Sequence, residues 1–368
     1  MNETLLTLLV FILAFGGMVI IHEFGHFIVA RLCKIEVEEF GIGLPTPGAL
    51  TLFTWQGTRF TLNWLPLGGF VRPKGENDPT VPGGLAAANP WARLAVLFAG
   101  PLMNLLTAVI IYSIIFTRVG VPDTSRVLVS SVVAESPAAQ AGFQTDDIFV
   151  SANGQPIRSV DDLRAIVDAN SGKPVDFLVD RHGEQIELTA TPLLNETEKR
   201  SMIGVGLGAP FKEPTSWLET LNLGARYTYM NIRTLISLPA QMIRGSLAPE
   251  QGRLIGLKGI YDVFSQTVNR DVEATTTAPV STDPLDQPIR TLDLIASLSI
   301  SLGIFNLFPF PALDGGRIIF ILPELIFRRR VSPRVENLVH GLGMAFLLAF
   351  MVYVNVMDFV DPIAITVP

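Results

Sequence analysis

The chain has 368 residues, of which 49% are hydrophobic and 17% charged, and its mean hydropathy is +0.42. This composition is too apolar for an ordinary soluble protein and predicts an integral membrane protein. The net charge of −7 and the lack of a basic tract argue against nucleic acid as a partner. Cys33 is the only cysteine, which excludes an intrachain disulfide and a cysteine-cluster metal site.

Four apolar runs are long enough to cross a hydrocarbon core of about 30 Å, namely residues 5–29, 92–116, 292–310 and 338–357. The leader before the first run carries no positive charge, so we expect this run to be kept as a span. Lysine and arginine are concentrated after the first and third runs, which predicts that these two connections are cytoplasmic. Both termini and the long middle segment are then extracytoplasmic.

The first run leads into the sequence His22-Glu23-Phe24-Gly25-His26. On a helix, His22 and His26 share one face, so both imidazoles can bind one ion. Two imidazoles and a carboxylate suit Zn²⁺ with a fourth position left for water, and Glu23 is the expected general base. The alternative is a chance HExxH motif with satisfied histidines, but these groups are costly in lipid unless they have a function.

The best candidate for a third metal ligand is Asp314, which follows the third run. Because the first and third runs both cross from outside to inside, we expect Asp314 at the depth of His22. An ordinary Asp-Gly turn is the alternative. Three competitors are weaker by their place in the chain: Asp293 and Asp358 lie at outer ends of runs, and His340 follows a polar loop.

Between the first two runs, residues 36–78 mix glycine, proline, aromatic and β-branched residues. Alternation interrupted at Gln56-Gly57 predicts a β-hairpin, which residues 65–70 close. Non-helical backbone at membrane depth is tolerated only inside protein or beside a water-filled cavity. A cytoplasmic hairpin without substrate contact is the alternative.

The composition becomes soluble between residues 123 and 210. Helices are predicted at 136–143 and 161–170, strands at 127–132, 175–180 and 185–191, and a strand with an Asn-Gly turn within 147–157. His182 falls in a hairpin turn and is expected to be exposed. Residues 216–244 predict a helix at the outer membrane interface, and residues 268–287 a loop or disordered link.

Three motifs follow one another along the chain: HEFGH in the first run, Gly100-Pro101-Leu102-Met103-Asn104 in the second, and residues 306–316 at the end of the third. Together they resemble the site-2 protease family of intramembrane zinc metalloproteases, and the resemblance covers nearly the whole chain. The branch that includes the regulator-of-sigma-E protease is most similar, because the middle segment resembles a circularly permuted bacterial PDZ domain. That segment has Asp146 where such domains usually have glycine, which we expect to affect the fold little.

The resemblance implies that His22, His26 and Asp314 bind zinc and that Glu23 is the catalytic base. One departure is Arg317, where relatives often have histidine. Because the ligand aspartate is intact, we expect no loss of activity.

Further site residues follow from the same resemblance. Asn306 is expected to hold the substrate backbone, and Pro311 and Gly69 are expected to contact substrate. The segment 36–78 corresponds to a membrane-dipping β-sheet whose edge can pair with an unwound substrate. The second-run motif supplies three residues expected to pack near the site: Gly100, Pro101 and Asn104.

The expected fold is an α-helical membrane protein with four transmembrane helices, a membrane-associated β-hairpin or sheet after the first, and an α+β PDZ-like domain inserted between the second and third. The expected divisions are two halves of a membrane core at 1–117 and 291–368, the PDZ-like domain at 118–212, and interfacial helices with a linker at 213–290.

The expected function is an intramembrane zinc endopeptidase of the bacterial inner membrane. It would cut single-pass substrates, an anti-sigma factor or remnant signal peptides, near the cytoplasmic side. The expected partners are such a transmembrane substrate, the lipid bilayer and a candidate peptide at the PDZ-like groove, although we favour a size-filter role for that domain. A non-catalytic PDZ-bearing membrane scaffold is the alternative.

Overall fold

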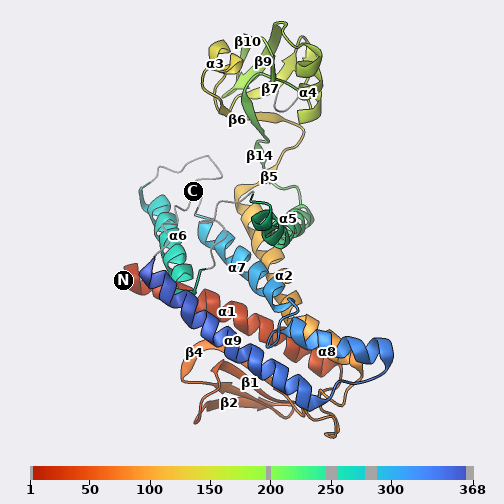
Figure 1. The fold of residues 1–368 in the computed structure, drawn as a ribbon. Helices are drawn as coiled ribbons and strands as arrows, with labels where there is room; N and C mark the ends of the chain where they lie inside the picture. Colours follow the sequence, from red (N-terminus) through yellow and green to blue (C-terminus); the bar gives the residue numbers. More distant parts are fainter. Residues whose placement is uncertain (1–2, 196–199, 246–254, 278–287, 362–368) are drawn as a thin grey trace. The chain divides into compact units, whose positions relative to one another are not determined.

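The structure is a computed structural model of residues 1–368, and it describes all of them except 1–2, 196–199, 246–254, 278–287 and 362–368 (Figure 1). The chain forms two compact units. One consists of Met1–Phe116 with Ser216–Pro368, and the other of Thr117–Thr215. The first unit is mainly helical with one small sheet, whereas the second is built mostly of β-strands.

Among the described residues, three helices are long and apolar enough to cross a membrane: α1 (Glu3–Leu32), α2 (Pro90–Val119) and α9 (Pro333–Val360). Many of their large apolar side chains are exposed, including Leu13 and Leu342. Lipid is the surroundings in which such a surface is stable. These helices confirm a membrane protein.

The third apolar run ends as a helix earlier than predicted. Helix α7 (Arg290–Asn306) has 17 residues and a length of roughly 26 Å. Pro309 and Pro311 follow it, and proline donates no backbone hydrogen bond and disfavours helical backbone at the residue before it. A new helix, α8 (Asp314–Phe327), begins at Asp314. Asp314 therefore starts a helix, and a membrane crossing by the third apolar run stays a prediction.

The segment after α1 forms a four-stranded sheet, which is the sheet form of the expected hairpin or sheet, and the local alternation predicted only its hairpin. The strands are β1 (Val37–Leu44), β2 (Leu50–Trp55), β3 (Thr58–Leu62) and β4 (Leu65–Pro73), in the order β2-β3-β1-β4. The hairpin at Gln56-Gly57 joins β2 to β3, and both residues have positive φ. Strand β1 pairs parallel with β3 and antiparallel with β4, which local alternation cannot reveal.

One face of this sheet packs against the end of α1. The ring of Phe27 lies 5.7 Å from that of Phe40 on β1 and 5.6 Å from that of Phe60 on β3. These residues belong to a buried cluster that includes Val37 and Val96. The packing fixes the sheet beside the histidine motif.

Two further helices pack against the spans of this unit. Helix α5 (Trp217–Ile243) starts at the N-cap Ser216 and places Tyr227 5.1 Å from Tyr112 of α2, measured between ring centroids. Helix α6 (Leu257–Thr277) includes Val268, which is buried beside Phe11 of α1. The prediction of a linker was therefore wrong for residues 268–277, because this tertiary packing outweighs the polar composition; residues 278–287 lie outside the described part.

The second unit contains a sheet in the order β10-β9-β7-β6-β13, with β8 paired to β7. Its elements are β6 (Val127–Val132), α3 (Pro137–Ala141), β7 (Ile148–Ala152), β8 (Gln155–Pro156), α4 (Val160–Ala169), β9 (Val175–Arg181), β10 (Glu184–Ala190) and β13 (Val205–Gly208). Phe143, Phe149 and Phe177 form its core.

Two short strand pairs complete the second unit. They are β5 (Val121–Pro122) with β14 (Phe211–Lys212), and β11 (Leu193–Asn195) with β12 (Arg200–Met202). The predicted helix that ends at Gly142 is confirmed, since Gly142 adopts a left-handed C-cap with φ of 87°. The insert is thus an α+β unit.

Candidate metal centre

Three potential ligand atoms converge from α1 and α8. Nε2 of His22 lies 3.2 Å from Nε2 of His26, and Oδ2 of Asp314 lies 3.2 Å from the first nitrogen and 3.4 Å from the second. In a tetrahedral zinc site with bonds of about 2.0–2.1 Å, neighbouring ligand atoms are about 3.3 Å apart. The three atoms therefore have the spacing that a single tetrahedral ion requires.

The surroundings of these atoms also favour a cation. His22 and His26 are only 6% and 9% exposed. Oδ2 of Asp314 is buried and accepts no hydrogen bond from the part of the chain that the structure describes. A buried acceptor without a partner is costly, whereas a bound metal ion would satisfy it. The two nitrogens and one oxygen suit Zn²⁺.

The ring of His26 is oriented by α2. Its Nδ1 lies 2.7 Å from the carbonyl oxygen of Val96, which can only accept a hydrogen bond, so the Nδ1 atom carries the proton. Nε2 of the neutral ring then presents a lone pair toward Asp314 and His22. Metal-binding histidines are commonly held by such a backbone carbonyl.

The ring of His22 contacts the side-chain amide of Asn104, which is fully buried on α2. The amide nitrogen and Nδ1 of His22 are 3.1 Å apart, and the amide oxygen has no hydrogen-bond partner among the described residues. Turning the amide by 180° exchanges its oxygen and nitrogen while the shape stays the same. The oxygen then accepts from Nδ1–H, and Nε2 of His22 is free to bind metal.

Helix α2 approaches the motif closely because each of the two helices has a glycine where it contacts the other. A Cβ on Gly100 would collide with the ring of His26 and would lie 2.8 Å from Nε2 of His22. A Cβ on Gly25 would collide with the carbonyl group of Ala99. Glycine is therefore required at both positions for the histidines to lie against α2.

The start of α8, where Asp314 lies, packs tightly against the segment before it. Gly315 and Gly316 are buried, and a Cβ on either would collide with the backbone of the preceding turn. Arg317, one turn after Asp314, forms an ion pair with Glu76 in the connection before α2. This pair gives the departure at position 317 a structural role.

Glu23 lies between the histidines in sequence and faces the sheet. Its Oε2 accepts a hydrogen bond of 3.1 Å from the backbone N–H of Val71 on β4. Gly69 on the same strand is close, since a Cβ there would lie 3.5 Å from Cγ of Glu23. This contact directs Oε2 toward β4, and Oε1 takes no part in it.

The remaining predicted site residues lie outside the group of three ligand atoms. Asn306 ends α7, and its side-chain amide donates to the carbonyl oxygen of Leu302 at 2.9 Å. Pro311 belongs to the turn before α8, and Pro101 lies inside α2, where a Cβ on Gly303 would be 3.0 Å from its carbonyl oxygen. None of these three contributes to the group of ligand atoms, which consists of His22, His26 and Asp314 in the described part of the chain.

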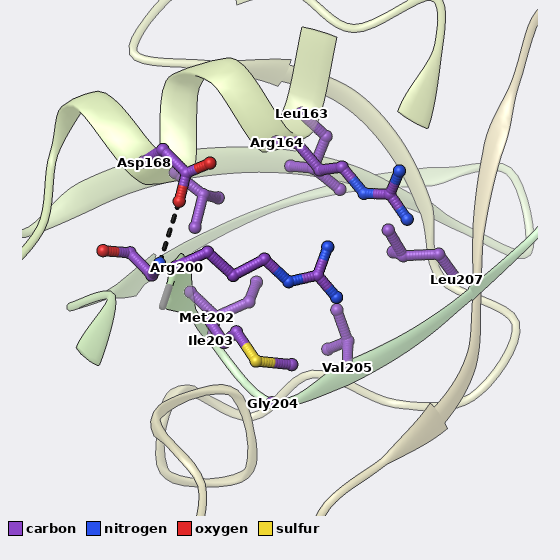
Figure 2. A pocket seen from close by; sticks show the side chains of 11 residues that line it. Leu163, Arg164, Asp168, Arg200, Met202, Ile203, Gly204, Val205 and Leu207 are labelled. Atoms are coloured by element: carbon purple, nitrogen blue, oxygen red, sulfur yellow. Dashed lines mark hydrogen bonds between the residues drawn. The ribbon is translucent and has the colours of Figure 1, made fainter. Parts of the chain in front are cut away.

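The inserted unit has a separate pocket between α4 and the residues 200–207 (Figure 2). Leu163, Arg164 and Val167 line it from the helix. The backbone N–H of Ser201 donates to Oδ1 of Asp168 at 2.8 Å and fixes one end. Strands β12 and β13 build the opposite wall, and at three and four residues they are too short for the sequence pattern to predict.

Comparison with protein families gives one match that spans most of the chain. The model of "Peptidase family M50" matches residues 10–350. Metalloprotease MmpA of Caulobacter vibrioides is 31% identical over 370 residues, which cover 91% of this chain and 90% of that protein.

Two other relatives are matched over a larger share of their own length. A "Putative zinc metalloprotease" of Clostridium perfringens is 31% identical, with 96% of this chain and 98% of the relative covered. One of the same name from Bartonella henselae is 30% identical, with 93% and 98% covered. Among solved structures, the PDZ domain of an SdrC-like protein from Listeria monocytogenes is 18% identical and has a TM-score of 0.21, covering 22% of this chain and 85% of that one.

A match of this extent, together with the relatives' names, establishes what the chain is. It belongs to the peptidase family M50 and is a metalloprotease of the site-2 protease type.

Proposed function

We propose that the chain is a zinc endopeptidase that cuts a membrane-spanning protein substrate, with His22, His26 and Asp314 as the zinc ligands. The observation that carries this proposal is the convergence of their three ligand atoms at 3.2 to 3.4 Å in a buried place. A zinc ion bound there supplies a Lewis acid that makes water a nucleophile at neutral pH.

In this proposal Glu23 is the general base and acid. Its Oε1 takes the proton from the attacking water and later gives it to the leaving amine of the substrate. The hydrogen bond from Val71 to Oε2 holds the carboxylate in one orientation, so that only Oε1 exchanges the proton. Asn104 and Val96 keep both imidazoles turned with Nε2 toward the third ligand.

We propose that the substrate binds as an added strand beside β4. A transmembrane helix hides its scissile carbonyls in its own hydrogen bonds, so it must unwind before cleavage. The edge of a sheet can replace the lost partners. Strand β4 is an edge strand of its sheet, and Gly69 leaves this edge uncrowded next to Glu23. Asn306 and Pro311 are proposed to hold the substrate from α7 and the turn after it.

The proposed location is the bacterial inner membrane, with cleavage near the cytoplasmic side. The clusters of basic residues after the first and third apolar runs support this orientation. The inserted unit, proposed to be PDZ-like and extracytoplasmic, would then exclude substrates with a bulky outer domain. Substrates trimmed beforehand, such as an anti-sigma factor or a remnant signal peptide, fit this selection.

Two variants of the purified full-length protein test this function. Glu23→Gln is expected to retain zinc but to lose cleavage of a model transmembrane substrate, because glutamine cannot accept the proton of water. Asp314→Ala is expected to lose both zinc and cleavage. Cleavage by Glu23→Gln at the wild-type rate would refute the role of Glu23, and wild-type protein that binds no zinc would refute the metal centre.

A further inference from the structure

We propose that His340 on α9 is a positioning residue, which holds the turn before Asp314 so that this carboxylate meets the two imidazoles. The proposal rests on the zinc centre proposed above and extends it to a helix that contributes no ligand. Three contacts between α9 and the turn support it.

The first contact is a hydrogen bond to the turn itself. The backbone N–H of Ala312, two residues before Asp314, donates to Nδ1 of His340 at 2.9 Å. Ala312 has φ of 78°, in the left-handed region that residues with a Cβ rarely adopt. Such a conformation persists only when surrounding contacts hold it. The histidine acceptor is one of these contacts.

The second contact comes from Gly343, one turn further along α9. This glycine is buried, and a Cβ on it would collide with the Cβ of Pro311 and lie 2.8 Å from the carbonyl oxygen of Pro311. The backbone of α9 therefore lies directly against the turn. His340 and Gly343 are three residues apart and share one helical face.

The third contact fixes the imidazole ring. Its centroid lies 5.3 Å from that of Phe320 on α8, the helix that Asp314 begins. Because Nδ1 accepts a hydrogen bond, the proton of the neutral ring is on Nε2. Nε2 is buried without a hydrogen-bond partner in the described part of the chain, so the ring makes its one hydrogen bond to Ala312.

These contacts bear on Asp314 through the backbone. Asp314 is the first residue of α8, so the direction in which the chain leaves Ala312 and Leu313 decides where the carboxylate points. Loss of the hydrogen bond allows Ala312 to relax toward negative φ. Oδ2 of Asp314 would then move away from the two Nε2 atoms.

The test compares His340→Asn with His340→Leu in the full-length, detergent-purified protein. Asparagine places Oδ1 near the position of Nδ1 and retains the acceptor, whereas leucine has a similar shape without it. Zinc affinity is measured by competition with a chelator of known affinity. The leucine variant is expected to bind zinc about 10–100-fold more weakly, as is common when a group supporting a metal ligand is lost. The asparagine variant is expected to bind zinc almost as tightly as wild type.

Two further variants serve as support and control. Gly343→Ala pushes Pro311 without altering His340, and it is expected to weaken zinc binding as well. Asn337→Leu changes an exposed residue on the same helix and is expected to leave zinc affinity unchanged. Melting temperatures of the zinc-free proteins show whether each variant folds. If the leucine variant does not fold, the glycine variant provides the comparison.

The outcomes separate this proposal from the one on which it rests. Wild-type zinc affinity in His340→Leu, or in Gly343→Ala, would overturn the positioning role while the zinc centre stands. An equal loss in the asparagine and leucine variants would also overturn it, because the acceptor would then not matter. If Asp314→Ala bound zinc as tightly as wild type, the proposed centre itself would fail.

Discussion

Gly100 decides whether two imidazoles and a carboxylate can meet beside α2. Its missing side chain leaves the space that the ring of His26 occupies, and a methyl group there would also lie 2.8 Å from Nε2 of His22. The position therefore belongs to the proposed metal centre, although it contributes no ligand. From the sequence alone it was expected only to pack near the site.

We predict that Gly100→Ala abolishes zinc binding, because the added methyl group must displace at least one histidine ring. Zinc content of the purified variant, measured by elemental analysis, checks this. The matched control is Gly17→Ala on α1, where a Cβ would have no atom within 4 Å. That control is expected to retain zinc and to be more stable by up to about 1 kcal/mol, since alanine favours helix over glycine. Full zinc content in Gly100→Ala would contradict the prediction.

With its amide oxygen toward the ring, Asn104 holds the neutral His22 in the tautomer that has its proton on Nδ1. We predict that Asn104→Leu lowers zinc affinity about 10–100-fold, because Nδ1–H of His22 loses its buried acceptor. Asn104→Asp keeps an acceptor at the same place and is expected to retain more of the affinity. Chelator competition measures both variants. The reverse order, with leucine tighter than aspartate, would mean that the amide donates to His22.

At the scale of elements, the sequence predicted the helices and turns that depend on residues close together in the chain. The apolar run before HEFGH predicted α1, and the spacing of His22 and His26 predicted that both rings share a face. The hairpin at Gln56-Gly57 was predicted by its turn residues. The parallel pairing of β1 with β3 was not, because it depends on residues about 20 positions apart along the chain.

The elements around Asp314 were also predicted only in part, because some of their contacts join residues far apart in the chain. Asp314 was expected near the histidines from the matched depth of two runs, and Oδ2 lies 3.2 Å from Nε2 of His22. That α7 ends before the prolines, and that Asp314 begins α8, follows from local proline chemistry that a hydropathy window ignores. The contact of His340 with Ala312 joins α9 to the turn before α8, and no local sequence pattern predicts a contact between residues 28 positions apart.

In the inserted unit, the turn between α3 and β7 contains a strained residue. Asp146 has φ of 71°, which costs free energy for any residue with a Cβ and explains why glycine is usual there. We predict that Asp146→Gly raises the free energy of unfolding of this unit by up to about 1 kcal/mol, after the entropy of glycine in the unfolded chain is subtracted. Hydrogen exchange of Phe149 and Phe177 amides in the full-length protein measures the change. Faster exchange in the variant would contradict it.

At the scale of the whole molecule, the proposed catalytic groups and metal ligands come from segments far apart in the chain. Glu23 and the histidines belong to α1, their supporting groups to α2 and β4, and Asp314 to α8. The centre therefore exists only when both parts of the first unit, before and after the insert, are folded together. The position of the proposed metal centre in the membrane therefore depends on which of these helices cross it.

The number of crossings can be decided by labelling, because Cys33 is the only native cysteine. In a Cys33→Ser background, single cysteines are placed at three exposed positions: Asn77 after α1, His182 in the insert and Arg329 after α8. A membrane-impermeant maleimide is added to spheroplasts with and without detergent. The cysteine-free parent is the control for background labelling.

We predict that the cysteine at position 182 reacts in intact spheroplasts and that those at 77 and 329 react only after detergent is added. Helix α2 separates Asn77 from His182, and its 30 residues are ample for a crossing. Between His182 and Arg329 the crossing depends on α7, whose 17 residues are near the minimum. If α7 does not cross, position 329 reacts from the same side as position 182. Labelling of position 329 in intact spheroplasts would therefore reject a crossing by α7, and it would place Asp314 on the opposite side of the bilayer from the basic connection after α1.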